Sequence, residues 1–282
     1  MVNKEKNYIL LIDCTDEKGL VHKISGILYG HSFNMIGNSE YVDRENNHFF
    51  MRTELIGDFS REKLTKELKS VLPEDAKINF HGKKKKDIVV LATKEYHCLG
   101  DLLVRHHFGD LNANIKAVIS NHNKLEKFTK KFDIPYHFIS HENMDRDIHE
   151  NKVAEIVQSY NPEYVILAKY MRILSPMFVE KFSNKIINIH HSFLPAFIGA
   201  NPYKQAYNRG VKIIGATAHF VNNELDEGPI ILQDITHVDH KMTAKDMSKA
   251  GRDVEKIVLA KALKSVFDDR VFIDGNKTII FD

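Results

Sequence analysis

The stretch Tyr164-Val165-Ile166-Leu167-Ala168 decides the fold, because it is an almost unbroken apolar run without polar alternation. Asp87–Ala92 and Ile115–Ser120 are similar runs, and amphipathic helical segments separate the three. Strands buried on both faces read as continuous apolar runs, and strands that alternate with helices form parallel sheets. We therefore predict that residues 83–282 form a Rossmann-like α/β domain with a mostly parallel sheet.

Shorter segments complete this pattern. Further strands are expected at Tyr136–Ile139, Lys185–Ile187 and Thr217–Val221, and helices at Cys98–Arg105, through Leu125 and Phe128, and at Ala154–Tyr160. In such folds ligands bind beyond the carboxyl ends of the strands. Asn188 follows one of these strands directly, so we expect the functional site there.

Residues 1–82 show a different order of elements. Strands are predicted at Tyr8–Asp13, from Asn34 to Asp43, at His48–Leu55 and at Lys77–Phe80. One helix follows Leu20 with Ile24, Ile27 and Leu28 on its apolar side, and a second follows Ser60, which is expected to cap it. The order βαββαβ predicts a ferredoxin-like sandwich.

Four consecutive lysines, Lys83 to Lys86, mark the boundary between the two regions. Like charges in a row repel one another and favour water, so we predict a solvated linker here. A nucleic-acid patch is the alternative, but the run is isolated and the net charge is only +2. We expect no nucleic-acid partner.

Composition narrows the class of protein further. Hydrophobic residues make up 43% of the 282 residues, enough for two cored domains. Cys14 and Cys98 are the two cysteines and form no CxxC pattern, which favours a reducing compartment. The sequence has no signal-peptide pattern and no apolar run long enough to cross a bilayer. We expect a cytoplasmic protein with no membrane partner.

Chemically useful side chains gather in the second region. Asn188-Ile189-His190-His191-Ser192-Phe193-Leu194-Pro195 is followed by His219 and by Leu225-Asp226-Glu227-Gly228-Pro229. A carboxamide, imidazoles and a carboxylate at strand ends are what transfer or hydrolysis of a small acyl group requires. His237 and His240 lie three apart, but no third ligand accompanies them, so we expect no metal.

The N-terminal region resembles an ACT domain. The resemblance rests on Asp16, Gly19 and Leu20 in the turn after the first strand, and on Asn34 at the start of the second. ACT domains pair sheets across subunits and bind small amino acids at those interfaces. The resemblance therefore implies a homo-oligomer and a candidate amino-acid effector site at these four residues. A purely structural dimerisation module is an equal alternative.

The second region resembles the formyltransferase fold family, which handles the formyl group of 10-formyltetrahydrofolate. Asn188, His190, Leu194-Pro195, His219, Asp226 and Gly228-Pro229 match its motif in order and spacing. Glycinamide ribonucleotide formyltransferases hold the acceptor's phosphate with a Gly-rich turn after the first strand of this domain. Thr93–Asp101 has no such run of glycines and adds Glu95. This segment, Leu167–Arg172 and Asn188–Ala200 instead resemble formyltetrahydrofolate deformylases, as does the ACT-like region.

This resemblance covers nearly the whole chain and implies a hydrolase acting on a linear amide C–N bond. It would convert 10-formyltetrahydrofolate to formate and tetrahydrofolate, balance one-carbon pools and supply formate for purine biosynthesis, with no cofactor. A formyltransferase with an amine acceptor is the alternative. A regulatory folate-binding protein is a third hypothesis, which the full set of Asn188, His190 and Asp226 disfavours.

Residue roles follow from the chemistry and the resemblance. Asn188 is expected to stabilise the oxyanion, and His190 to donate to the same oxyanion or to protonate the leaving nitrogen. Asp226 is expected to act as general base, activating water or relaying a proton to the leaving nitrogen, with a pKa raised by Leu225 and Ile230. His219 is expected to orient Asp226 or to hold the water. Whether Asp226 or a histidine takes the first proton stays open, as does a role for His191. The resemblance places the folate against residues that we list together: Met171, Arg172, Ile173, Leu174, Val221 and Gly228.

Overall fold

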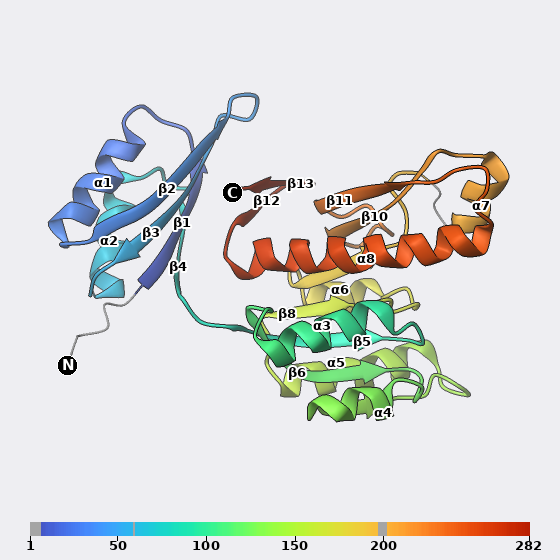
Figure 1. The fold of residues 1–282 in the computed structure, drawn as a ribbon. Helices are drawn as coiled ribbons and strands as arrows, with labels where there is room; N and C mark the ends of the chain where they lie inside the picture. The colour runs from blue at the N-terminus through green and yellow to red at the C-terminus, as the bar shows by residue number, and fades with distance from the viewer. Residues whose placement is uncertain (1–6, 59, 197–201) are drawn as a thin grey trace. The chain divides into compact units, whose positions relative to one another are not determined.

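A computed structural model describes residues 7–58, 60–196 and 202–282 of the chain (Figure 1). The chain divides into two compact units, one of Met1–Lys84 with Phe281–Asp282 and one of Lys85–Ile280. No helix within the described ranges is both long and apolar enough to cross a membrane.

The first unit has the predicted βαββαβ order. Its elements are β1 (Asn7–Thr15), α1 (Leu20–Gly30), β2 (Asn34–Asp43), β3 (His48–Ile56), α2 (Arg61–Val71) and β4 (Lys77–Gly82). The sheet has the order β2-β3-β1-β4 with antiparallel neighbours, and both helices lie on one of its faces (Figure 1). The ferredoxin-like prediction is confirmed.

Packing explains the helices of this unit better than capping does. Leu20, Ile24 and Leu28 of α1 and Leu64 and Leu68 of α2 are buried against the inner face of the sheet. Ser60 stands at the N-cap position of α2, but its side chain makes no capping hydrogen bond, contrary to the prediction. The apolar stripe is therefore what fixes α2.

The second unit is the predicted α/β domain. Its seven-stranded sheet has the order β11-β10-β9-β8-β5-β6-β7. The strands are β5 (Lys86–Ala92), β6 (Ala113–Ser120), β7 (Tyr136–Phe138), β8 (Tyr164–Leu167), β9 (Ile186–His190), β10 (Ile213–Phe220) and β11 (Ile230–His237). From β7 to β9 the neighbours are parallel, while β10 and β11 pair antiparallel. A two-stranded hairpin, β12 (Val271–Asp274) and β13 (Lys277–Ile280), follows.

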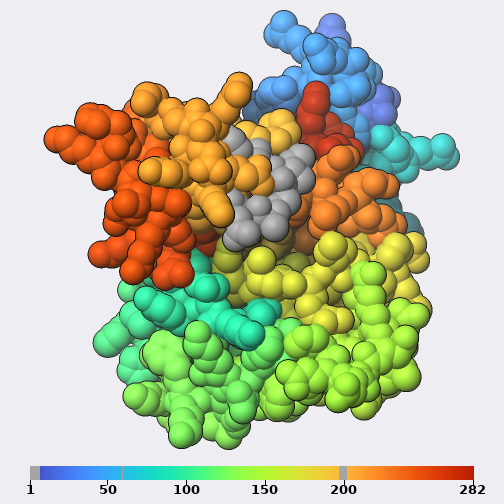
Figure 2. Space-filling view, turned by 90° about the vertical axis from the view of Figure 1, so that its right-hand side faces the viewer, coloured from blue at the N-terminus to red at the C-terminus, as the bar shows by residue number. Residues whose placement is uncertain are grey.

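Helices cover this sheet. They are α3 (His97–Phe108), α4 (Glu126–Thr129) with the 3-10 turn Lys130–Phe132, α5 (Arg146–Ser159), α6 (Pro176–Lys181), α7 (Pro202–Arg209) and α8 (Ala244–Phe267). Asp145 caps α5, which starts earlier than predicted, and Thr243 and Asp246 form a capping box on α8. In the view of Figure 2, α7 and the segment that follows β8 reach the same face of this unit.

The lysine run is not entirely a solvated linker. Lys83, Lys84 and Lys85 are exposed, but Lys86 is the first residue of β5 and its side chain is only 2% exposed. Its Nζ lies 2.8 Å from Asp269 Oδ1 and 3.8 Å from Glu163 Oε1. The ion pair with Asp269 therefore stabilises Lys86 in a buried position. The prediction of a solvated linker was wrong for this residue.

Candidate active site

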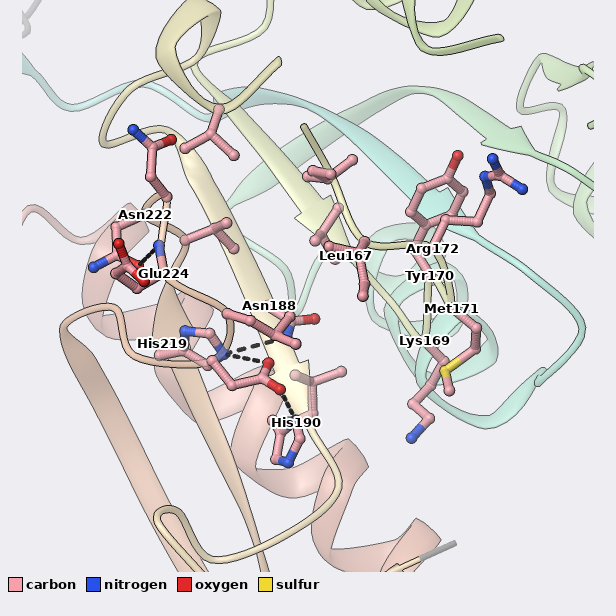
Figure 3. Close-up of a pocket in the computed structure, with 18 of the residues that line it drawn as sticks. Leu167, Lys169, Tyr170, Met171, Arg172, Asn188, His190, His219, Asn222 and Glu224 are labelled. Carbon is pink, nitrogen blue, oxygen red and sulfur yellow. Dashed lines mark hydrogen bonds and ion pairs between the residues drawn. The ribbon is translucent and has the colours of Figure 1, made fainter. Parts of the chain in front are cut away.

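A cavity of about 460 Å³ opens at the carboxyl ends of β8 and β9 (Figure 3). That is the size of a small-molecule site. One wall is the segment Leu167–Leu174, a second is Asn188–His191, and a third is His219 with Val221–Asp226. The structure thus gathers at one sheet edge the residues that the sequence places far apart.

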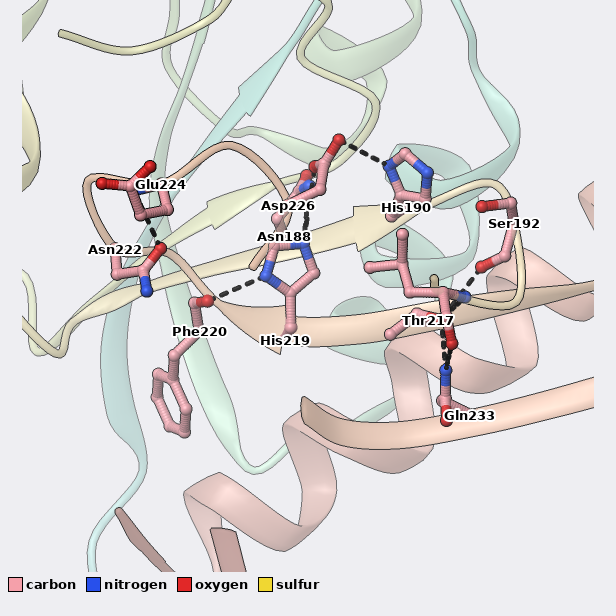
Figure 4. A network of polar contacts seen from close by, with 11 residues as sticks. Asn188, His190, Ser192, Thr217, His219, Phe220, Asn222, Glu224, Asp226 and Gln233 are labelled. Atoms are coloured by element: carbon pink, nitrogen blue, oxygen red, sulfur yellow. Dashed lines mark hydrogen bonds and ion pairs between the residues drawn. The ribbon is translucent and has the colours of Figure 1, made fainter. Parts of the chain in front are cut away.

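His219 orients Asn188 (Figure 4). The Nδ1 of His219 lies 2.8 Å from the carbonyl oxygen of Phe220, so this nitrogen carries the proton and donates. The Nε2 then accepts from the Asn188 amide at 3.2 Å. Burial lowers the pKa of His219, which keeps the ring neutral and preserves this arrangement. The second Asn188 N–H is left to donate to a ligand.

His190 and Asp226 form an ion pair, with 3.3 Å between Nδ1 and Oδ2 (Figure 4). The other carboxylate oxygen lies 3.7 Å from His219 Nε2, too far for a hydrogen bond. His219 therefore contacts Asn188 more directly than Asp226, which differs from the expected role. Asp226 itself has a left-handed backbone, with φ of 58°, at the turn that carries its side chain into the cavity.

The expected rise in the pKa of Asp226 is wrong. Burial acts to raise this pKa, but the hydrogen bond from His190 and the nearby imidazoles outweigh burial, and the pKa is lowered from its usual value. The carboxyl is therefore ionised at neutral pH. The imidazole has a larger effect on the pKa than the apolar neighbours have, because a hydrogen bond to the charged form stabilises that form directly.

His191 stacks on His190, with ring centroids 5.0 Å apart, and lines the same cavity. Burial, Lys169 and His190 together lower the pKa of His191 from 6.5 to about 4. Its ring is therefore neutral at physiological pH and can both donate and accept a hydrogen bond.

Stability should depend on pH through His191. Its folded pKa of about 4 lies below the unfolded value of 6.5. As the pH falls from 6.5 toward 4, the unfolded chain therefore binds a proton at this residue while the folded chain does not, and the folded state loses stability. We expect the wild type to lose about 1–2 kcal/mol more unfolding free energy than His191→Gln between pH 7.5 and pH 5.0. Urea unfolding at both pH values measures this. His240→Gln, at an exposed position, should behave as the wild type does; equal losses in all three proteins would contradict the prediction.

Five of the predicted folate-binding residues line the cavity: Met171, Arg172, Ile173, Leu174 and Val221. Met171 and Ile173 are 58% and 61% exposed, so they are not ordinary core residues. Leu225, which the sequence reasoning did not select, is 57% exposed and lines the cavity too. These exposed apolar side chains give a flat ring a surface to cover.

Gly228, the sixth predicted folate-binding residue, does not line the cavity, and its role is in the backbone packing. A Cβ built on it would lie 1.9 Å from the carbonyl oxygen of Phe220. Only glycine allows this close approach of two backbone segments, which holds the turn that carries Asp226 against the end of β10.

Gly228→Ala should therefore lower both stability and activity. We expect a loss of at least about 2 kcal/mol in unfolding free energy, because the backbone must separate to admit the methyl group. Urea unfolding measures the loss. Gly100→Ala is the control within the same unit, since a Cβ there meets side-chain atoms no nearer than 3.5 Å. Equal stability of the two variants would contradict this reading of Gly228.

The four candidate effector residues do not gather within one copy of the chain. Asp16, Gly19 and Leu20 follow Thr15, which pairs with His48, whereas Asn34 and Asn7 pair with Ile56 at the other end of the sheet. Leu20 is 2% exposed and belongs to the core. The structure therefore brings together three of the four residues and leaves Asn34 apart.

One buried group has the residue types of a metal site. The ligand atoms of His97, Cys98 and Glu255 lie within 4.8 Å of one another. However, the Glu255 carboxylate already accepts from His97 and Tyr203 and contacts Lys169, and burial raises the pKa of the Cys98 thiol well above its usual value. A cation there would have to displace an ammonium group and ionise the thiol.

Sequence reasoning also missed Lys169, which lines the cavity, and its buried partner Glu255. Lys169 is the second residue after β8, and a charge so close to the end of an apolar strand was the available signal. Glu255 was a carboxylate on the apolar side of α8, among Val254, Val258 and Leu259. The motif residues Phe197, Ile198, Gly199 and Ala200 lie outside the described residues.

Comparisons with known proteins show which families the two parts of the chain resemble. Residues 86–263 match the family model described as formyl transferase, and residues 8–73 match that of the ACT domain. A formyltetrahydrofolate deformylase of Haemophilus influenzae is 54% identical over 96% of this chain and 98% of its own length.

Solved structures lead to the same family. A formyltetrahydrofolate deformylase from Pseudomonas syringae pv. tomato superimposes with a TM-score of 0.95 at 38% identity, covering 100% of this chain and 96% of its own. One from Burkholderia mallei has a TM-score of 0.92 at 34% identity, covering 98% of this chain and 100% of its own. Both the two-domain order and the fold are therefore shared.

Proposed function

The chain belongs to the formyltetrahydrofolate deformylase family, and we propose that it hydrolyses 10-formyltetrahydrofolate to formate and tetrahydrofolate. The observation that carries the proposal is the meeting of Asn188, His190 and Asp226 at one end of a cavity whose other walls are largely apolar. The apolar walls suit the folate ring, and the polar end suits the formyl group.

The proposed reaction starts with water. The ionised Asp226 takes a proton from water while the water oxygen forms a bond to the formyl carbon. The free Asn188 N–H donates to the oxyanion that develops on the formyl oxygen, while the Nδ1–H of His190 holds the Asp226 carboxylate. The C–N10 bond then breaks, the proton on Asp226 passes to N10, and the formic acid released loses its proton to the solvent to give formate. His219 acts as a positioning residue through Asn188.

Asp226 is the preferred first proton acceptor because of access. Its side chain is 15% exposed and lines the cavity, whereas the free Nε2 of His190 is buried and has no hydrogen-bond partner within the described residues. A water molecule in the cavity can thus reach the carboxylate without a movement of the chain.

The remaining roles are part of the same proposal. The ACT domain makes a homo-oligomer and an amino-acid effector our working hypothesis, with the effector between copies because Asn34 and Gly19 lie at opposite ends of the sheet. The free, buried Cys14 and Cys98 suit the cytoplasm. The reaction as proposed uses no cofactor.

The test is incubation of the purified protein with 10-formyltetrahydrofolate and no acceptor. We expect equal amounts of formate and tetrahydrofolate, because water is the only nucleophile present. Formate is measured enzymatically and tetrahydrofolate by chromatography. Product formation that requires an added amine would replace hydrolysis by formyl transfer.

A further inference from the structure

A buried charge network lies beside the cavity and has no part in the mechanism above. At its centre is Glu255 of α8, whose side chain is 1% exposed. It accepts from His97 Nε2 at 2.7 Å and from the Tyr203 hydroxyl, and Lys169 Nζ lies 3.2 Å away. Gly251, one turn earlier, makes room, since a Cβ there would lie 2.1 Å from the Tyr203 hydroxyl oxygen. Glu255 is thus the centre of a buried hydrogen-bonded network and not part of a surface ion pair.

The Glu255 carboxyl is ionised in this pair. Burial acts to raise the pKa of Glu255, but the hydrogen bond from His97 and the charge of Lys169 outweigh burial and lower it to about 2. The carboxylate in turn fixes the ammonium group, because a buried ion without its partner is costly. The positive charge of Lys169 is thus held in one place.

Lys169 also belongs to the cavity. It lines the wall next to His190 and His191, its side chain is 8% exposed, and it extends toward the side where His190 lies (Figure 3). Its backbone is left-handed, with φ of 62°, a conformation that favours glycine and costs a non-glycine residue about 1 kcal/mol or more. Such strain persists where the surroundings hold the residue, here Glu255.

Lys169 lies at the polar end of the cavity, beside the residues that face the formyl group in the proposed reaction. The apolar residues Met171, Ile173 and Leu225 take the folate side of the cavity, and Asn188 and Asp226 face the formyl group. Lys169 and the neutral His191 form the polar part of the wall next to His190, and the other polar lining residues include Arg172, Asn222, Asn223 and Glu224. A nucleophile that approached the formyl group from this side would meet the ammonium group of Lys169.

The segment after β5 contacts α8 and the network around Glu255. His97, at the start of α3, reaches Glu255, and Glu95 pairs with Arg252 of α8 at 3.2 Å. The turn that lacks a glycine-rich phosphate cradle thus supplies side chains that bind α8.

We propose that Lys169, held by Glu255, is a specificity-determining residue that excludes amine acceptors from the cavity and so reserves the formyl group for water. The ammonium group repels a protonated amine and occupies the space that an amine needs, whereas water fits beside it as a hydrogen-bond acceptor. The inference rests on the proposed hydrolysis and explains why the same catalytic groups give hydrolysis rather than transfer.

Removal of the Lys169 side chain should open a transfer reaction. In that reaction the amine nitrogen bonds to the formyl carbon, the C–N10 bond breaks, and one amine proton passes through Asp226 to N10. Lys169→Gly is the variant of choice, because glycine suits the left-handed backbone. The probe is glycinamide, a small primary amine, added with 10-formyltetrahydrofolate, and N-formylglycinamide and formate are measured by mass spectrometry.

We expect the share of formyl groups transferred to glycinamide to rise at least tenfold in Lys169→Gly over the wild type, with the formate share falling. Lys169→Arg should resemble the wild type because it keeps the charge. Lys94→Gly is the matched control, an exposed lysine that follows β5 as Lys169 follows β8. If Lys169→Gly does not fold, Lys169→Gly/Glu255→Gln removes both charges together and takes its place.

Two results would overturn the inference. One is a folded glycine variant that releases formate and transfers no more than the wild type does. The other is an arginine variant that transfers as much as the glycine variant. Formate release by the wild type without amine tests the hydrolysis itself, so failure of that function is seen separately.

Discussion

Asp226→Asn is expected to lose about a thousandfold in kcat for release of formate from 10-formyltetrahydrofolate. Asparagine keeps the shape of the side chain and suits the left-handed backbone at this position, where φ is 58°. It cannot accept the proton of water or return one to N10. The loss is therefore chemical rather than structural, and formate release under saturating substrate measures it.

Glu227→Gln is the matched control for this variant. Glu227 is the next residue and is exposed, and it is not among the residues that line the cavity. Binding of tetrahydrofolate, followed by calorimetry, should change less than threefold in both variants. A value of kcat for Asp226→Asn within tenfold of the wild type would rule out Asp226 as the base and return the role to a histidine.

Lys86→Met is expected to lower the unfolding free energy by about 3–5 kcal/mol, the cost of breaking a buried ion pair. The ammonium group lies 2.8 Å and 3.1 Å from the two carboxylate oxygens of Asp269, and the two side chains are 2% and 6% exposed. Methionine fills the same space but leaves the carboxylate without this cation. Urea unfolding at pH 7.5 measures the change.

Two further variants decide whether charge is the cause. Lys85→Met removes an exposed lysine one position earlier and should change the unfolding free energy by no more than about 0.5 kcal/mol. Lys86→Met/Asp269→Asn removes both charges and should recover part of the loss, and asparagine suits the φ of 52° at that position. A double variant less stable than Lys86→Met would show that the pair is not the main source of stability.

Apolar periodicity was the part of the fold that could be read from the sequence. The runs Asp87–Ala92 and Tyr164–Ala168 predicted β5 and β8 to within a residue, because a parallel strand buried on both faces leaves no room for polar side chains. The helix predicted through Leu125 and Phe128 is shorter in the structure, where it consists of the four residues of α4 and a 3-10 turn. Helix propensity says little about where a helix ends.

The candidate site divides in the same way. The types and order of Asn188, His190, His219 and Asp226 in the sequence pointed to acyl chemistry, and the strand pattern placed them at the carboxyl edge of the sheet. The sequence could not show which atoms of these side chains contact each other. That His219 serves Asn188 depends on a ring nitrogen held by the Phe220 carbonyl, a contact set by the register of β10.

The sequence by itself thus determined the two-domain order, the class of each sheet and the set of reactive groups, because side-chain burial and motif order are local properties of the chain. The tertiary structure alone decided the ionisation of Asp226, the burial of Lys86 and the pairing of Lys169 with Glu255. In each case the partner is distant in the sequence: His190 and Asp226 are 36 positions apart, and Lys86 and Asp269 are 183 apart. Electrostatic interaction depends on distance in space rather than along the chain, so only the folded structure could reveal these effects.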